Sequence, residues 1–184
     1  GKTLTSLNCL LQISNKFKFY QALILVPTIT LVEQWEDECK RFNFSHIIKV
    51  SSKNQGWRSE IDDIKLKESL AESDESSLSF IIITTYASFS RESTFKQLMS
   101  LSKKIQRQML LIADEAHNIG APNIMSKLDR VKILRRIGLS ATPERQFDDK
   151  GNKAVMQFFG CDAQYTFEYS MKEAIDNGFL CRYR

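Results

Sequence analysis

The sequence of 184 residues lacks the features of membrane and secreted proteins. No apolar run approaches the roughly 20 residues that a membrane-spanning helix needs, and we expect no secretory signal. The 42% hydrophobic and 26% charged content is typical of a globular protein, and the length suits one domain with a buried core. The net charge of +4 permits a polyanionic partner without demanding one. We therefore expect an intracellular domain, cytoplasmic or (in a eukaryote) nuclear, with no membrane partner.

Cysteine and histidine are too few and too scattered for a zinc cluster. The four cysteines show no C-x-x-C spacing, and the only histidines are His46 and His117. We expect reduced, packed thiols, as in other intracellular proteins, and no redox role for Cys9, Cys39, Cys161 and Cys181.

The stretch 109–117, Met-Leu-Leu-Ile-Ala-Asp-Glu-Ala-His, runs from apolar residues straight into two carboxylates, Asp114 and Glu115. Such a run predicts a strand buried on both faces of a parallel sheet, and open α/β sheets bind ligands at the carboxyl ends of their strands. Two acids there suit a magnesium–nucleotide site, in which one holds the magnesium shell and the other orients or deprotonates an attacking water. The alternative interpretation is a solvated turn.

Two further motifs favour the nucleotide interpretation. Gly1-Lys2-Thr3 matches the end of the phosphate-binding pattern G-x-x-x-x-G-K-[ST], in which the lysine reaches the β- and γ-phosphates and the hydroxyl holds magnesium. The strand and the first part of that loop are absent before Gly1, so we expect a domain truncated inside the loop. Residues 138–143, Gly-Leu-Ser-Ala-Thr-Pro, close another apolar strand with the hydroxyls of Ser140 and Thr142.

Gly-Lys-Thr, then Asp-Glu-Ala-His, then Ser-Ala-Thr resembles the first motor domain of superfamily-two helicases and translocases. Pro27-Thr28 with Leu31, Gln34 and Trp35 looks like motif Ia of that family, and Thr84-Thr85-Tyr86 looks like its segment Ic. The tail, residues 174–180 with Tyr183, is similar to the domain exit in the branch of type III restriction subunits and repair helicases.

This resemblance implies a three-layer α/β, RecA-like P-loop NTPase domain over residues 1–184 with a mostly parallel central sheet. It implies ATP and Mg²⁺ as cofactors, and a second RecA-like domain, absent here, that supplies an arginine to the developing charge. The parent protein would be an ATP-dependent helicase or ATPase, and the isolated chain would be inactive. The track would be nucleic acid, with DNA favoured over RNA because Gln34-Trp35 and the tail match the DNA-directed branch. A nuclease or methylase is a possible partner.

The resemblance also assigns roles to residues of this sequence. Gly1, Lys2 and Thr3 bind phosphate, Thr3 and Asp114 hold magnesium, and Glu115 activates water. His117, Ser140 and Thr142 relay the nucleotide state to the nucleic-acid contacts, which are Pro27, Thr28, Gln34, Thr84, Thr85 and Tyr86.

Several alternatives stay open at this point. Thr28 could simply cap a helix, Thr84-Thr85-Tyr86 could be an ordinary strand end, and His117 could be a satisfied structural residue. The whole protein could be a nucleotide-gated switch that remodels a protein partner, or a degenerate, non-hydrolysing scaffold. The intact Lys2 and Glu115 argue against degeneration but do not separate motor from switch.

Periodicity predicts the remaining elements. Apolar runs predict strands at 22–26, 46–50, 80–83 and 137–139. Helical spacing predicts helices after Thr3 (Leu4, Leu7, Leu10 and Leu11 inward), at 31–42, at 57–70 (Ile61, Ile64 and possibly Leu66 inward), at 95–105, at Pro122 and at 170–178. We expect a surface loop at 72–77, a polar turn at 146–153, and a solvated basic face formed by Lys127, Arg130, Lys132, Arg135 and Arg136.

Overall fold

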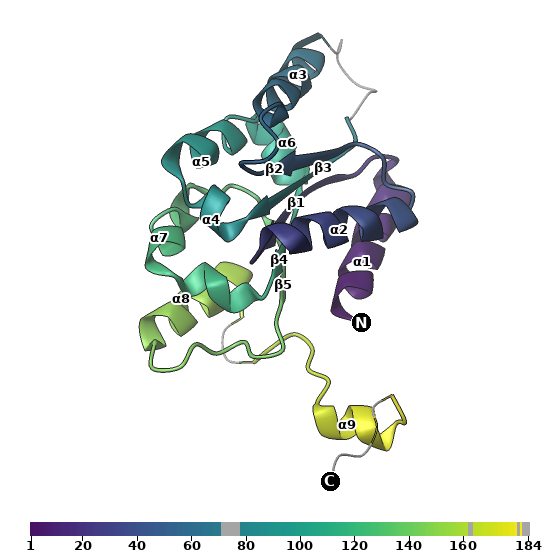
Figure 1. Cartoon of the computed structure of the whole chain (residues 1–184), viewed down its shortest axis with the longest axis vertical. Helices are drawn as coiled ribbons and strands as arrows, with labels where there is room; N and C mark the ends of the chain where they lie inside the picture. Colours follow the sequence, from purple (N-terminus) through teal and green to yellow (C-terminus); the bar gives the residue numbers. More distant parts are fainter. Residues whose placement is uncertain (71–77, 162–163, 180, 182–184) are drawn as a thin grey trace.

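The computed structural model describes residues 1–70, 78–161, 164–179 and 181 (Figure 1). Its described strands form one sheet of five in the order β2-β3-β1-β4-β5, and every neighbouring pair is parallel. The strands are β1 (Gln21–Val26), β2 (Ile47–Val50), β3 (Phe80–Thr85), β4 (Leu110–Asp114) and β5 (Arg135–Leu139). The predicted parallel sheet is confirmed.

Helices cover both faces of the sheet, which completes the predicted three-layer α/β fold (Figure 1). One face is covered by α1 (Lys2–Phe17) and α2 (Ile29–Arg41). The other face is covered by α3 (Trp57–Leu70), α4 (Tyr86–Phe89), α5 (Glu92–Leu98), α6 (Lys103–Gln108), the 3₁₀ helix η1 (Ala116–Gly120), α7 (Pro122–Met125), a second 3₁₀ helix η2 (Leu128–Arg130) and α8 (Asp149–Phe159). The last helix, α9 (Met171–Asp176), lies apart from these layers (Figure 1).

Successive side chains along a strand point to opposite faces of the sheet, and so each strand contributes to the hydrophobic core on both faces. In β1, Leu23 and Leu25 belong to the α3–α8 core, while Ala22, Ile24 and Val26 belong to the α1–α2 core. Every residue of β1 and β3 is buried, as expected for central strands with helices on both faces. Burying a side chain of this size contributes about 1.5–3 kcal/mol, so these runs hold the sheet edge that carries the polar motifs.

The long helices are where the spacing predicts them, with two exceptions on their inward faces. In α1, Leu7 and Leu10 are buried, but Leu4 is 50% exposed. At 100° per residue, Leu4 lies about 90° from the centre of the buried face formed by Leu7 and Leu10. In α3, Leu66 is 56% exposed because it lies about 180° from Ile61 and Ile64, on the opposite side of the helix.

Two predicted elements are wrong in detail. The helix expected over residues 95–105 is divided into α5 and α6, because the Ser102 hydroxyl accepts a hydrogen bond from the Ile105 N–H (3.1 Å) and starts a new helix. The polar turn expected at 146–153 is mostly the first turns of α8, whose N-cap Asp148 accepts from the Gly151 N–H (2.8 Å). Asp, Gly and Asn favour turns and helix starts alike, so composition did not separate the two.

Other expectations near the chain's surface have mixed outcomes. The capping box of α9 is confirmed, because Ser170 accepts from the Glu173 N–H and Glu173 accepts from the Ser170 N–H. All four cysteines are free, but only Cys39 is buried; Cys9 and Cys181 are exposed. The predicted loop 72–77, and Leu180 and Tyr183 of the tail, lie outside the described residues. None of the helices in the described part of the chain combines the length and apolarity that a bilayer crossing requires.

Candidate nucleotide site

The candidate site is at the carboxyl edge of the sheet, where parallel strands bring their ends together. Asp114 ends β4, and Glu115 follows it. The register pairs Asp114 with Leu139, so Ser140 leaves the neighbouring strand beside Glu115. The amino end of α1 lies close to the same edge, as shown by the distance of 3.3 Å between the Lys2 ammonium and Oε1 of Glu115. The three motifs predicted to act together are therefore in contact.

The start of α1 has the features of an anion site. Its N-cap, Gly1, makes no side-chain capping hydrogen bond, and the first turn contains no acidic residue. Within the described residues the Thr3 hydroxyl makes no hydrogen bond. The helix dipole and the uncapped N–H groups favour a phosphate at this end, and Lys2 adds a positive charge that is 43% exposed.

Glu115 is held in an uncommon backbone conformation. Its φ of 50° and ψ of 60° lie in the left-handed region, which costs a non-glycine residue about 1–2 kcal/mol. The Asn118 side chain donates to the Glu115 carbonyl (2.8 Å), as does the Asn118 N–H (3.0 Å). Strain of this kind is found at sites where a side chain must be aimed, and here it aims a carboxylate at Lys2.

The Glu115 carboxylate is also contacted from the Ser-Ala-Thr motif and approached by His117 of its own motif. The Ser140 hydroxyl donates to Oε2 (3.2 Å), and Nδ1 of His117 lies 3.3 Å from Ser140 Oγ and 3.6 Å from Oε2. Thr142 joins through its backbone N–H, which donates to Ser140 Oγ (3.1 Å), while its side chain is exposed. The predicted coupling residues are thus within one hydrogen-bonded network.

Asp114 is oriented by two donors on its carboxylate. The indole N–H of Trp35 donates to Oδ2 (3.0 Å), and the N–H of Glu115 donates to Oδ1 (3.1 Å). Each oxygen keeps a lone pair for a water or a metal. The sequence places Trp35 on the apolar face of a helix and in the segment that resembles motif Ia, but no spacing signal joins it to a residue 79 positions away.

Arg145 is a second residue that sequence reasoning missed. Its Nη1 donates to the His117 carbonyl (3.1 Å) and its Nε donates to Asp148 (2.6 Å), the N-cap of α8. Asn152 of α8 exchanges two hydrogen bonds with the Arg145 backbone, at 2.7 and 3.0 Å. Arg145 therefore ties the segment after the Ser-Ala-Thr motif and α8 to the Asp-Glu-Ala-His turn. An arginine two residues after Pro143 carries no pattern from which this could be predicted.

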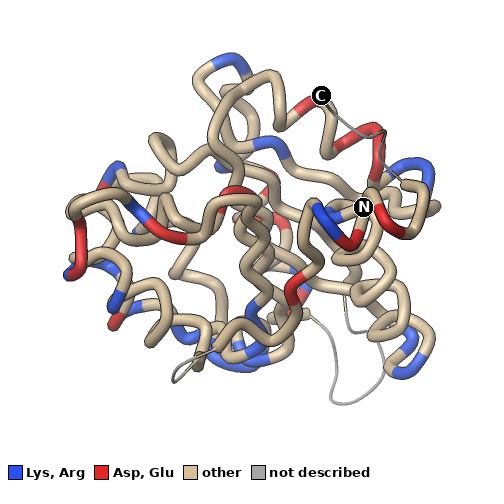
Figure 2. The backbone as a smooth tube through the Cα atoms, turned by 90° about the horizontal axis from the view of Figure 1, so that it is seen from below, with Lys and Arg blue, Asp and Glu red and all other residues tan. Residues whose placement is uncertain are grey.

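The predicted nucleic-acid contacts are divided between exposed and buried positions. Thr28 is exposed and caps α2, accepting from the Leu31 N–H (3.3 Å), and Gln34 in the same helix is also exposed. Pro27, between β1 and Thr28, is half-buried. In Figure 2 both charge signs lie around the whole periphery of the described chain. A nucleic-acid contact would therefore depend on these individual groups rather than on net charge.

Thr84, Thr85 and Tyr86 are buried, and their hydroxyls have partners inside the domain. Thr84 donates to the Val50 carbonyl (3.2 Å), and Thr85 accepts from the Ser88 N–H (3.1 Å) as the N-cap of α4. Tyr86 donates to the Asp114 carbonyl (2.8 Å), and burial, reinforced by Asp114 and Glu115, raises the pKa of its hydroxyl well above the usual value. Their contact with nucleic acid stays a prediction.

The residues at this edge fit a magnesium–nucleotide complex better than a bare metal. The described residues contain no group of three or more His, Cys, Asp or Glu that could hold a metal alone. Mg²⁺ in nucleotide sites needs fewer protein ligands, because phosphates and waters complete its octahedron. The free hydroxyl of Thr3 and the oriented carboxylate of Asp114 are the residues that could hold it.

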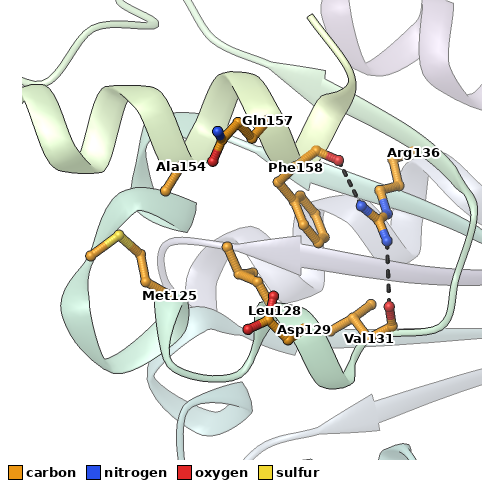
Figure 3. A pocket seen from close by; sticks show the side chains of 8 residues that line it. All are labelled: Met125, Leu128, Asp129, Val131, Arg136, Ala154, Gln157 and Phe158. Carbon is orange, nitrogen blue, oxygen red and sulfur yellow. Dashed lines mark hydrogen bonds between the residues drawn. The ribbon is translucent and has the colours of Figure 1, made fainter.

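A cavity of about 360 Å³ lies elsewhere, between α7, η2, β5 and α8 (Figure 3). Its wall includes Arg136, which stacks 4.0 Å from the Phe158 ring centroid and donates to the Phe158 carbonyl (2.7 Å). Arg136 pairs with Leu111 near the amino ends of β5 and β4, so the cavity is distant from the carboxyl edge along the strands. Burial lowers the pKa of Arg136. The predicted solvated basic face is therefore wrong for Arg136, and also for Lys127, which is 9% exposed and paired with Glu92 (2.9 Å).

Comparisons with known proteins agree with this geometry. A family model described as "Type III restriction enzyme, res subunit" matches residues 1–145. No curated protein matches the chain. The fold is similar to the Sulfolobus solfataricus SWI2/SNF2 ATPase core in complex with dsDNA, with 22% identity and a TM-score of 0.59 over 86% of this chain and 29% of that one. It is also similar to the Pyrococcus furiosus Hef helicase domain, with 18% identity and a TM-score of 0.62 over 89% and 32%.

The chain spans under a third of each of these two solved structures. At this level of identity the likeness concerns the fold, which is the predicted RecA-like helicase fold. The family model, by contrast, covers most of the sequence and all three nucleotide motifs. The chain therefore belongs to the family of type III restriction enzyme res subunits, and its fold is the RecA-like fold of helicase domains.

Proposed function

We propose that this domain binds ATP with Mg²⁺ and that the whole protein uses ATP hydrolysis to translocate along, or unwind, DNA. The observation that carries the proposal is the contact network at the carboxyl edge, in which Glu115 meets Lys2 at 3.3 Å and Ser140 at 3.2 Å. Three motifs more than 20 positions apart converge there on one carboxylate. Residues 1–184 would be the first RecA-like domain, and a second one in the same protein would complete the motor.

Lys2 and Glu115 exchange partners when the phosphates arrive. Their ion pair is partly exposed, and such pairs stabilise a protein by about 1 kcal/mol or less. Lys2 can therefore turn from Glu115 to the β- and γ-phosphates at little cost, together with Gly1 and Thr3 at the start of α1. This exchange releases Oε1 of Glu115 to accept a proton from an attacking water, while the Ser140 hydroxyl, itself in contact with His117, holds Oε2.

Asp114 serves the metal rather than the water. Trp35 and the Glu115 N–H hold its carboxylate in one orientation, and this carboxylate together with the Thr3 hydroxyl would hold magnesium. Magnesium, when bound, neutralises the phosphate charge and orients the γ-phosphate. The remaining requirement of phosphoryl transfer is a cation on the developing charge, commonly an arginine. We assign that arginine to the second domain, so that residues 1–184 alone hydrolyse ATP slowly or not at all.

Exposed polar groups at the start of α2 support the proposal that the protein moves along nucleic acid. The Thr28 hydroxyl and the first N–H groups of α2 are suited to phosphate oxygens, and Gln34 is exposed on the same helix. The SWI2/SNF2 relative is a complex with dsDNA, which favours DNA over RNA. A nuclease or methylase partner would fit the restriction-enzyme family.

The test is ATP hydrolysis by the full-length protein without polynucleotide, with duplex DNA, with single-stranded DNA and with RNA. Strong stimulation by DNA is expected, and its loss in Glu115→Gln assigns it to this site. Stimulation by RNA alone would overturn the track assignment. An ATP hydrolysis rate that none of the polymers changes would overturn the motor proposal and favour a nucleotide-gated switch acting on a protein.

A further inference from the structure

Each of the two segments predicted to touch nucleic acid contains a side chain that donates a hydrogen bond to Asp114. Trp35 of α2 donates to its carboxylate oxygen Oδ2 (3.0 Å), and Tyr86, the first residue of α4, donates to its carbonyl oxygen (2.8 Å). Asp114 is thus contacted from both helices that begin at the carboxyl edge next to β1 and β3. The network described above, through His117 and Ser140, reaches Glu115 instead.

Each donor is fixed by its surroundings. Trp35 is 2% exposed and Tyr86 is 7% exposed, so water does not easily replace their partner. An indole N–H can only donate, and a carbonyl oxygen can only accept, so the Tyr86 hydroxyl is the donor in its contact with Asp114. Among the described residues, each of the two side chains makes this one hydrogen bond only. Neither donor can leave Asp114 without becoming unsatisfied.

The donors sit on the same rigid elements as the predicted contacts. Trp35 is seven residues after Thr28 in α2, which is about 10 Å or two helical turns along one axis. Tyr86 follows Thr85 directly, and Thr85 caps the helix that Tyr86 begins. A displacement of α2 on contact near Thr28, or of the turn that begins α4, therefore moves a donor relative to Asp114.

We propose that Trp35 and Tyr86 are positioning residues that make Asp114 the junction between nucleic acid and the magnesium site. Contact at the start of α2 shifts the orientation of the Asp114 carboxylate through Trp35, and contact near α4 shifts its backbone through Tyr86. The coupling is reciprocal, so magnesium–nucleotide at Asp114 changes the affinity for the polymer by the same factor. This inference rests on the proposed function and adds a route that does not pass through His117, Ser140 and Thr142.

The direct readout is the indole N–H signal of Trp35 in ¹⁵N-labelled full-length protein. It is identified by its absence from Trp35→Phe, which removes the donor and keeps an aromatic ring. We expect the signal to shift on adding Mg²⁺ with ADP, and to shift again on adding a short duplex DNA. The control is the indole N–H signal of Trp57, which is identified by its absence from Trp57→Phe. Trp57 is buried on the opposite face of the sheet. A Trp35 signal that responds to neither addition would overturn the proposal.

The second readout is the Mg²⁺ concentration that half-saturates hydrolysis, with and without duplex DNA. In the parent protein, duplex DNA should lower this half-saturating Mg²⁺ concentration. In Trp35→Phe we expect a half-saturating concentration about tenfold higher, the lower end of the effect of losing a partner of a metal ligand, and a weaker response to DNA. Tyr86→Phe should weaken the response to DNA, whereas Trp57→Phe and Tyr20→Phe should leave it unchanged.

The outcomes separate the two claims. A parent protein whose hydrolysis ignores every polymer contradicts the proposed function itself. A parent protein stimulated by DNA, with Trp35→Phe and Tyr86→Phe both equal to their controls in Mg²⁺ dependence, leaves the function standing and overturns the junction. Should Trp35→Phe fail to fold, Tyr86→Phe carries the same test alone.

Discussion

The ammonium of Lys2 lies 3.3 Å from Oε1 of Glu115, although 113 positions separate the two residues. The contact joins the first turn of α1 to the residue after β4. It holds a cation that is proposed to bind phosphate against the carboxylate that is proposed to activate water, in a pair exposed enough to open.

Replacing Lys2 tests the phosphate site. In Lys2→Ala of the full-length protein we expect affinity for Mg²⁺–ATP to fall at least tenfold, because a charged contact to phosphate contributes about 1.5–3 kcal/mol. The melting temperature should change little, since an exposed ion pair adds about 1 kcal/mol or less. Lys16→Ala, in the last turn of the same helix, is the matched control. Equal nucleotide affinity in the two variants would remove Lys2 from the site.

Removing the Ser140 hydroxyl tests the support of Glu115. We expect Ser140→Ala to lower kcat about tenfold with little change in KM, because a hydrogen bond to a charged group contributes about 1.5–3 kcal/mol. Ser140→Thr, which keeps the hydroxyl, should restore most of the rate. Ser126→Ala is the control, because the Ser126 hydroxyl bonds only the Asn123 carbonyl among the described residues. A kcat for Ser140→Ala equal to that of Ser126→Ala would show that the contact has no catalytic effect.

Gly120 tests the packing that joins the Asp-Glu-Ala-His turn to α8. A Cβ added there would lie 2.8 Å from the Gly151 carbonyl oxygen and 2.8 Å from Cδ of Arg145. Backbone must move to admit it, so we expect Gly120→Ala to lower the free energy of unfolding by about 1–3 kcal/mol. At Gly56 the nearest atom would be 3.6 Å away, and Gly56→Ala should cost much less. Denaturant unfolding of both variants gives the comparison.

The pH dependence of stability tests the Glu92 ion pairs. Hydrogen bonds from Lys127 and then Arg130 lower the pKa of Glu92 from 4.5 to about 2. A depressed carboxyl pKa contributes stability that is present above the unfolded pKa and is lost as pH falls through the folded one. We therefore expect the melting temperature to fall between pH 4.5 and 2, and to fall less steeply in Glu92→Gln. Glu33→Gln, at an exposed position of α2, should keep the parent slope.

Local sequence was sufficient for most of the fold. The apolar runs at 22–26 and 80–83 are strands because only burial on both faces satisfies residues such as Ile24 and Ile82. Short-range capping chemistry also predicted the helix start at Ser170, and Thr28 is a cap as considered, although α2 begins at Ile29 rather than at residue 31. Where the same residue types favour both a turn and a helix start, the sequence did not distinguish between them, as at the Asp148 cap of α8.

The site was less accessible to sequence because its contacts are long-range. Motif spacing brought Lys2, Glu115 and Ser140 together correctly. It gave no sign that the Trp35 indole, on an otherwise apolar helix face, reaches Asp114, or that Tyr86 turns inward to the same residue. Such pairings depend on how β1, β3 and β4 are ordered in the sheet, which a linear pattern does not encode.

The central claim is that Glu115 activates water while other residues bind the nucleotide. Its most direct test is Glu115→Gln in the full-length protein, with ATP binding and single-turnover hydrolysis measured on the same sample with duplex DNA present. We predict Mg²⁺–ATP affinity close to that of the parent and a hydrolysis step slower by about 10²–10⁴-fold, the range expected when a general base is removed. Hydrolysis at the parent rate, with ATP bound, would contradict the account.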